Sequence, residues 1–246
     1  MTGGVPGGEV PDKHEILRRL VAMSRDLGQP ERDYVILSEG NASARIDEMT
    51  FWVKASGVEM YQIDTNGFVE MAFDGMLATL DSSLSDEQVK QGLAAARVDP
   101  TTQAWPSMET VLHALALTLG GAQYVAHTHP TPIKAILCSQ GAKAAFAGHI
   151  FPAEAVVCGE PLFVPYAPPG QPLARAVREG LLLYNDRYDQ PPRVILLQNH
   201  GLVALGPTPE AVFAVTAMMV RAARALLGTY ALGGPHFIYP LTLTGG

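Results

Sequence analysis

The sequence predicts an α/β protein in which a single layered α/β/α domain is built around a central mixed, largely antiparallel sheet. Segments with apolar residues every three or four positions occur beside shorter apolar or alternating segments, the patterns of helices and strands. The two types do not alternate strictly, so some consecutive strands are expected to pair as antiparallel neighbours. A chain of 246 residues can bury one large core, and we expect one domain over residues 12–246. Residues 1–11, rich in Gly and Pro, are expected to form a flexible tail.

Composition narrows the classes of partner. The formal net charge is −7 and no Lys/Arg-rich run occurs, which argues against nucleic acid or an anionic membrane surface as a partner. The N-terminus lacks the basic and apolar regions of a secretion signal, and no stretch approaches the roughly 20 apolar residues of a membrane span. Two cysteines are too few for a disulfide framework. We therefore expect a soluble cytoplasmic protein.

The first half of the chain predicts one helix, three strands and a second helix. "DKHEILRRLVAMSRDLG" carries a helical apolar stripe that Gly28 ends. Alternating polar and apolar residues then predict strands near 41–46, 51–55 and 68–72. "SDEQVKQGLAAAR" predicts a surface helix with Ser85 as its N-terminal cap.

The second half predicts four helices and three strands. "PSMETVLHALALTLG" (106–120) predicts a helix with Ser107 as N-cap, and the strand "YVAHTH" follows it. A helix over about 131–139 comes next, and "PLARAVREGLLLY" predicts another. "RVILLQNHG" predicts a buried strand running into a turn, and "LVAL" a short strand. Thr208 then caps a long helix to about Leu227.

His127 and His129 are two residues apart at the end of the predicted strand "YVAHTH". Because side chains on one face of a strand recur every second residue, both imidazoles point the same way, as in a chelate. An isolated pair of this kind is more often two solvated histidines than a metal site. A third histidine and a nearby carboxylate would favour the metal.

Two further segments supply those groups. Glu109 and His113 are four apart on the predicted helix, so both project from one face. Such a pair commonly forms only a surface hydrogen bond, but most of its neighbours are apolar, and a buried carboxylate needs a cation. His200 follows an apolar strand and precedes Gly201, at a strand end where α/β proteins commonly build sites. Three imidazoles with an open position are the pattern of a catalytic zinc site.

These residues and their surroundings resemble the class II aldolase/adducin family from about residue 12 to 227. Six stretches carry the resemblance, in the order "EGNASAR" (39–45), "KASG" (54–57), "PSMETVLH" (106–113), "AHTHP" (126–130), "VPYAPPG" (164–170) and "LQNHGLVALG" (197–206). The family includes sugar-phosphate aldolases, pentulose-phosphate epimerases, a methylthioribulose-phosphate dehydratase and the catalytically silent adducin head. The resemblance therefore does not select one reaction.

The resemblance implies a divalent ion, Zn²⁺ or another such as Mn²⁺, Co²⁺ or Mg²⁺, held by His127, His129 and His200. It also implies that Glu109 is an acid–base residue and a candidate fourth ligand. It further implies a pocket for an anion, made by Gly40, Asn41, Ser56, Gly57 and Ser107. Small residues in "EGNAS" and "ASG" allow backbone N–H groups to approach phosphate, although plain turn chemistry explains them equally well.

The implied reaction is that of a metal-dependent aldehyde-lyase, a class II aldolase that cleaves a small hydroxy-keto or sugar-phosphate substrate through a metal-stabilised enediolate. Family epimerases carry Asp where this chain has Glu109, which favours an aldolase or a dehydratase. A dehydratase of the methylthioribulose-phosphate type and a non-catalytic adducin-like binding module stay open as alternatives. The intact metal ligands rank the binding module last.

The chain departs from the aldolase pattern at two positions. Met108 stands where the aldolases have a second serine, so one phosphate-facing hydroxyl is missing and a smaller or non-phosphorylated substrate stays open. Phe151 stands near the position of a tyrosine acid that the aldolases contribute from a neighbouring subunit. Other proton donors must then be considered: a metal-bound water, Tyr166, Tyr230 and Tyr239, of which Tyr166 and Tyr239 are our candidate catalytic residues.

The resemblance also implies a homotetramer whose active sites lie at subunit interfaces, with an apolar surface around Phe151 and Phe163. The segment 72–104 is longer than in the short form of the family, and the sequence assigns it no role.

Overall fold

A seven-stranded sheet forms the centre of the computed structural model, which describes residues 12–77, 80 and 86–238. The strands lie in the order β3-β2-β1-β4-β7-β6-β5. Their bounds are β1 Asn41–Arg45, β2 Thr50–Lys54, β3 Phe68–Ala72, β4 Tyr124–Thr128, β5 Leu162–Val164, β6 Val194–Leu197 and β7 Gly201–Gly206. Every neighbouring pair is antiparallel except β5 and β6, which run parallel. The predicted mixed, largely antiparallel sheet is confirmed.

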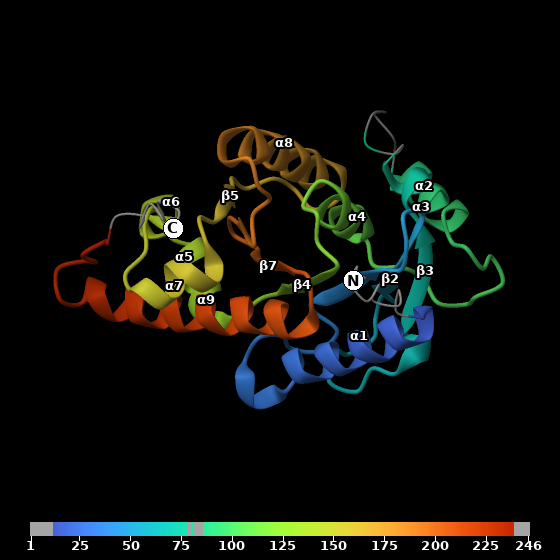
Figure 1. Cartoon of the computed structure of the whole chain (residues 1–246), viewed down its shortest axis with the longest axis horizontal. Helices are drawn as coiled ribbons and strands as arrows, with labels where there is room; N and C mark the ends of the chain where they lie inside the picture. The colour runs from blue at the N-terminus through green and yellow to red at the C-terminus, as the bar shows by residue number, and fades with distance from the viewer. Residues whose placement is uncertain (1–11, 78–79, 81–85, 239–246) are drawn as a thin grey trace, which may run out of the picture.

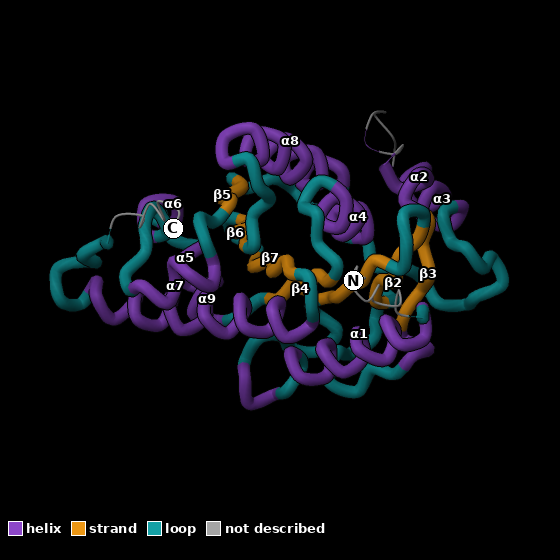
Figure 2. The backbone as a smooth tube through the Cα atoms, in the orientation of Figure 1, coloured by secondary structure: helices purple, strands orange, loops and turns teal. Residues whose placement is uncertain are grey.

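Helices cover both faces of this sheet, as Figures 1 and 2 show. Helices α1, α5, α7 and α9 pack on one face, α4 and α8 pack on the other, and α2 lies between α4 and α3. The bounds are α1 Lys13–Leu27, α2 Phe73–Leu77, α3 Asp86–Ala95, α4 Thr110–Thr118, α5 Thr131–Leu137, α6 Ala142–Ala145, α7 Pro152–Cys158, α8 Gln171–Tyr188 and α9 Pro209–Tyr230. Two 3₁₀ turns, Pro30–Arg32 and Thr65–Gly67, lie in the connections. The predicted α/β/α layers are confirmed.

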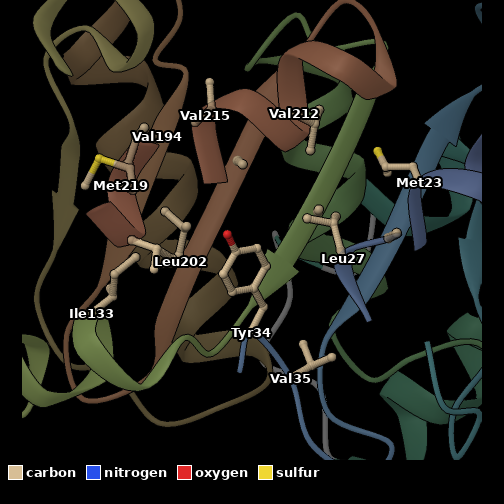
Figure 3. Close-up of a cluster of buried hydrophobic side chains, with 14 of the residues drawn as sticks. Met23, Leu27, Tyr34, Val35, Ile133, Val194, Leu202, Val212, Val215 and Met219 are labelled. Atoms are coloured by element: carbon tan, nitrogen blue, oxygen red, sulfur yellow. The ribbon is translucent and has the colours of Figure 1, made fainter. Parts of the chain in front are cut away.

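Alternate residues of the central strands enter two separate cores. In β4, Tyr124 and Ala126 enter the core beneath α1 and α9, whereas Val125 enters the core beneath α4 and α8. Figure 3 shows part of the first core, where Leu202 of β7 lies among side chains from the helices on that face. Because both faces of these strands are buried, a polar residue in them needs a specific partner. His127 is such a residue.

The long helix α9 corrects the expectation that no stretch of the chain approaches the length and apolar composition of a membrane span. Among the helices of the described segments, it alone is long and apolar enough to cross a membrane by length and composition. However, 44% of its most apolar window is buried inside the fold, and Val212, Val215 and Met219 pack into the first core. The core that α9 covers therefore accounts for its apolar composition. The hydroxyl of Thr208 accepts from the N–H of Ala211, so the predicted cap is confirmed.

Helix α4 begins later than the sequence suggests. Ser107 was expected at its N-cap, but the helix starts at Thr110 with Glu109 at the cap position. Ser107 is held by a neighbouring strand instead, because its N–H donates to the carbonyl of Lys54 at 3.2 Å. The hydroxyl of Ser107 accepts from the N–H of Glu109 at 3.2 Å and closes the turn ahead of the helix. The loop after β2 is thereby fixed against the start of α4.

The described parts of the segment 72–104 share a core with α4. It contains the last residue of β3, then α2 and α3, whose inward residues Phe73 and Leu93 belong to the same core as Val111 of α4. The helix predicted over 85–97 is confirmed as α3, but Ser85, its predicted cap, lies outside the described residues. Helices α2 and α3 therefore extend the core that α4 covers.

Candidate metal centre

The middle of the sheet brings the three histidines together. Strands β4 and β7 are antiparallel neighbours, so the end of β4 lies beside the start of β7. His127 is the penultimate residue of β4, His129 follows directly after the strand, and His200 immediately precedes β7. The predicted strand-end positions are observed, and sheet pairing supplies the third imidazole from a distant part of the chain.

The Nε2 atoms of the three imidazoles converge. His127 Nε2 lies 2.9 Å from His129 Nε2 and 3.3 Å from His200 Nε2. The candidate ligand atoms of all three residues lie within 4.8 Å of one another. Nitrogens that bind a tetrahedral zinc at about 2.0–2.1 Å are about 3.3 Å apart, so the observed spacing suits one shared ion.

Groups behind two of the imidazoles orient them. His127 Nδ1 lies 3.0 Å from the carbonyl oxygen of Leu202, which can only accept, so Nδ1 carries the proton and Nε2 keeps a free lone pair. His129 Nδ1 lies 3.1 Å from Glu39 Oε2, an ion-pair distance without the alignment of a hydrogen bond. A carbonyl or carboxylate behind the ring is the usual support of a metal-binding histidine.

Glu109 reaches the same point from the start of α4. Its Oε1 lies 3.2 Å from His200 Nε2, and its Oε2 lies 3.5 Å from His127 Nε2. Burial by itself would raise the pKa of this carboxyl, but His127, His200 and the hydrogen bond from Asn41 together hold that pKa well below its ordinary range. Glu109 is therefore ionised at neutral pH.

This donor set fits a divalent cation. Burial lowers the pKa of His127 to about 4 against the opposing effect of Glu109, and burial also lowers the pKa of His129. Both rings are thus neutral near pH 7. Without an ion, His127 Nε2 can accept a hydrogen bond from His129 Nε2 at 2.9 Å, whereas with the His129 proton on Nδ1 both Nε2 atoms offer a lone pair to one cation. Three imidazoles and one carboxylate are ligands that zinc and related ions accept.

Gly201 permits the close approach of the two strand ends. A Cβ atom at this position would lie 2.5 Å from His129 Cδ2 and 2.6 Å from the carbonyl oxygen of Thr128. Any side chain here would push β7 away from β4 and move His200 out of the cluster. The glycine that follows His200 is therefore required by packing, a role that its turn-like sequence context did not reveal.

Four of the residues expected to bind an anion lie beside Glu109 or on the loop packed against it. Asn41 Nδ2 donates to Glu109 Oε2 at 2.8 Å and to Ser107 Oγ at 3.2 Å. Asn41 is 5% exposed and Ser107 is 9% exposed, so both are buried beside Glu109. Ser56 and Gly57 are exposed, and the backbone N–H of Ser56 is hydrogen-bonded to the segment that leads into Ser107.

Gly40 has a different explanation. Its φ of +70° is a backbone conformation that favours glycine. A Cβ atom would lie 2.5 Å from Val35 Cγ1 and 2.9 Å from the carbonyl oxygen of His127. Close packing against β4 and a positive φ account for this glycine without a bound anion.

Lys54 is a buried cation to which the sequence assigned no role. It is 2% exposed, and its Nζ donates to the carbonyls of Val58 at 2.5 Å, Ala55 at 3.2 Å and Ser38 at 3.4 Å. Burial lowers its pKa to about 8, although Glu109 acts in the opposite direction. Lys54 therefore ties the loops around the site together. Lys54 is the first residue of "KASG", one of the stretches that carry the family resemblance, and this position could have identified it as a residue of the site.

Of the candidate tyrosines that the structure describes, neither lies in the histidine cluster. Tyr166 donates its backbone N–H to the side chain of Gln198, two residues before His200, but its ring is 60% exposed and lines a groove along β5 and α8. Tyr230 is half exposed at the end of α9, and Tyr239 lies outside the described residues. Phe151 stands at the N-cap of α7, where its ring faces the guanidinium of Arg221.

Comparison with known sequences identifies the family. The chain matches the Class II Aldolase and Adducin N-terminal domain over residues 18–227. It is 28% identical over 193 residues to the "Uncharacterized oxidoreductase YuxG" of Bacillus subtilis (strain 168), a match that covers 75% of this chain and 26% of that protein. The chain thus spans about a quarter of the length of this relative, and the oxidoreductase description concerns the longer protein.

Solved structures share the fold. The N-terminal class II aldolase domain of a conserved protein from Thermoplasma acidophilum has a TM-score of 0.67 at 24% identity, covering 92% of this chain and 99% of that one. The l-fuculose-1-phosphate aldolase from Thermus thermophilus has a TM-score of 0.62 at 19% identity, covering 88% and 97%. At these identities the likeness shows the fold alone. The match over residues 18–227 decides the family, and the chain belongs to the class II aldolase and adducin family.

Proposed function

We propose that the protein is a metal-dependent aldehyde-lyase that cleaves a small hydroxy-keto or sugar-phosphate substrate. The observation that carries the proposal is the convergence of three imidazole nitrogens and the Glu109 carboxylate, at spacings of 2.9 to 3.5 Å. Membership of the family agrees with an enzyme of this kind. The reaction itself is the part that we propose, because the family also contains non-catalytic members.

His127, His129 and His200 would hold the ion, and Glu109 is placed either to complete its ligands or to move a proton. A divalent ion bound there supplies Lewis acidity, which stabilises negative charge on a substrate oxygen while a carbon–carbon bond breaks. Glu109, being ionised, can accept the proton of the substrate hydroxyl at a carboxylate oxygen as that bond opens. It can then return the proton to the carbon that keeps the electron pair.

The substrate is expected to carry an anionic group near Ser107. Asn41 and Ser107 are buried and hydrogen-bonded to each other, and the exposed Ser56 lies on the loop bonded to the segment that leads into Ser107, which supports an anion site there. Met108 is 47% exposed beside Ser107 and presents a thioether where the family aldolases have a hydroxyl. The pocket therefore suits a carboxylate of a keto acid as well as a phosphate.

A substrate screen separates this proposal from its alternatives. The metal-loaded protein would be incubated with panels of keto acids, ketose phosphates and thioribulose phosphates, and products would be measured by mass spectrometry. Release of an aldehyde, abolished by a chelator and restored by added metal, supports the lyase. Loss of water from an intact substrate indicates the dehydratase instead. A fully loaded protein that turns over no member of any panel favours the binding module.

An anion is expected to bind against Asn41, Ser56 and Ser107. Replacing Ser107 by alanine should weaken phosphate binding by about tenfold, because a hydrogen bond to a charged group contributes roughly 1.5–3 kcal/mol. Isothermal titration with inorganic phosphate measures this change, and the exposed Ser139 provides a matched Ser→Ala control. A crystal soaked in phosphate that shows the anion only elsewhere would contradict this pocket.

The protein is expected to be a homotetramer, with the surface around Phe151 and Phe163 in the subunit interface. Phe163 lines a groove of about 560 Å³ with Tyr166 and Leu183, whose side chains are 60% and 64% exposed. Burying such apolar surface in a closed symmetric assembly is a common solution for soluble proteins. Light scattering should give four times the chain mass of 26.3 kDa, and Leu183→Asp should lower it. A stable monomer at micromolar concentration would reject the tetramer.

A further inference from the structure

A chain of buried polar side chains runs from β1 through α4 to Glu109. His113 is fully buried on α4, and its Nδ1 lies 2.6 Å from the hydroxyl oxygen of Ser43. Its Nε2 makes a close hydrogen bond with Asn41 Oδ1. The other end of the same carboxamide, Asn41 Nδ2, donates to Glu109 Oε2 at 2.8 Å. His113 is thus connected to Glu109 through a single asparagine.

Only one arrangement of protons satisfies this chain. Asn41 Nδ2 donates to Glu109 Oε2 at 2.8 Å, so the carboxamide of Asn41 presents its NH₂ group there. Asn41 Oδ1 then faces His113 and needs a donor, which places the imidazole proton on Nε2. A neutral imidazole has one N–H, so its Nδ1 accepts from the hydroxyl of Ser43. Each hydrogen bond thereby fixes the direction of the next.

We propose that His113 is a positioning residue that, as its Nε2–H tautomer, holds the Asn41 carboxamide with its NH₂ group toward Glu109. The inference rests on the proposed function only in giving Glu109 a part in turnover. His113 itself is 0% exposed and cannot touch a substrate. Without it, only the bonds of Asn41 Nδ2 to Ser107 and Glu109 orient the carboxamide, which can then rotate, present an oxygen to the carboxylate and repel Glu109 from its place beside His127 and His200.

The tautomer can be measured in the metal-free protein without any substrate. Histidine labelled with ¹⁵N distinguishes protonated from unprotonated ring nitrogens by their chemical shifts, and the signal lost in His113→Gln assigns His113. We expect one protonated nitrogen, Nε2, over the whole pH range in which the protein stays folded. Protonation on Nδ1 would overturn the proposal, whatever reaction the protein catalyses.

A second experiment measures how the loss of the His113 Nε2–H donor changes kcat. His113→Phe keeps the ring volume but removes the N–H, and it should lower kcat at least tenfold with KM and metal content close to those of the parent protein. His113→Gln, whose side-chain NH₂ can still donate to Asn41, should recover most of kcat. Thr216→Val, which removes a buried hydroxyl from α9 far from this chain of residues, is the matched control and should leave kcat unchanged.

These outcomes separate the positioning role from a merely structural one. If His113→Phe and His113→Gln lose equal activity, or if both retain full kcat, the positioning role is wrong. If the tautomer is Nε2–H but no substrate is turned over, the lyase proposal fails while the arrangement of Asn41 stands. Ser43→Ala extends the test to a variant that keeps the imidazole, and we expect the Nε2–H tautomer to persist there because Asn41 Oδ1 still needs a donor.

Discussion

Replacing both His127 and His129 by alanine is expected to reduce bound metal from one ion per chain to a trace. The two residues supply two of the three converging nitrogens, and a single remaining imidazole with one carboxylate cannot enclose an ion tightly. Elemental analysis of both proteins, after loading with Zn²⁺ and removal of the excess, measures the change. This is the largest effect that we expect from any substitution.

The comparison needs a control that removes histidines without touching the cluster. His14 and His236 are both exposed, so the double variant His14→Ala/His236→Ala removes the same number of imidazoles from the surface. It should bind as much metal as the parent protein. Equal metal content in this control and in the His127/His129 variant would mean that the ion binds elsewhere or not at all.

Replacing Glu109 by glutamine is expected to lower kcat by a factor on the order of 10² to 10⁴, the usual contribution of a positioned acid–base group. Glutamine keeps the volume of the side chain but cannot accept and return a proton. The three imidazoles stay in place, so much of the metal should be retained. Turnover of the substrate found in the screen, normalised to bound metal, is the measurement.

The matched control is Glu70→Gln, because Glu70 on β3 is also partly buried and pairs with Lys13 at 3.2 Å, away from the histidines. Its turnover should stay close to that of the parent protein. Full activity in Glu109→Gln would remove Glu109 from proton transfer. A loss explained entirely by lower metal content would leave Glu109 only the role of a ligand.

The elements of the fold and the metal cluster followed from local patterns in the sequence. The two-residue spacing of His127 and His129 fixed their common direction, and the apolar run before His200 placed it at a strand end. The family resemblance then joined the three residues, and the family itself is confirmed. The sequence could not show that β7 lies between β4 and β6, since strand order depends on pairings between distant segments.

The positions that the sequence left uncertain are those that depend on tertiary contacts. Ser107 has the composition of an N-cap, yet the helix begins only at Thr110, after a turn in which the Ser107 hydroxyl accepts from the N–H of Glu109. Gly40 stays a predicted anion-binding residue, and its close packing against Val35 and the backbone at His127 is a second reason for a glycine there. Tyr166 stays a predicted catalytic residue, and within this chain it lines an exposed groove. Neither propensity nor spacing contains this information.

The position of β7 also determines when the centre can exist during synthesis of the chain. His127 and His200 are 73 residues apart, and β7 pairs with β4 on one side and with β6 on the other. Until the ribosome has released residues 201–206, no strand joins β3-β2-β1-β4 to β6-β5. Closing so long a loop costs entropy before the new contacts form, which makes this a late step of folding. An ion bound by all three histidines would then be found only in chains in which β7 has joined the sheet.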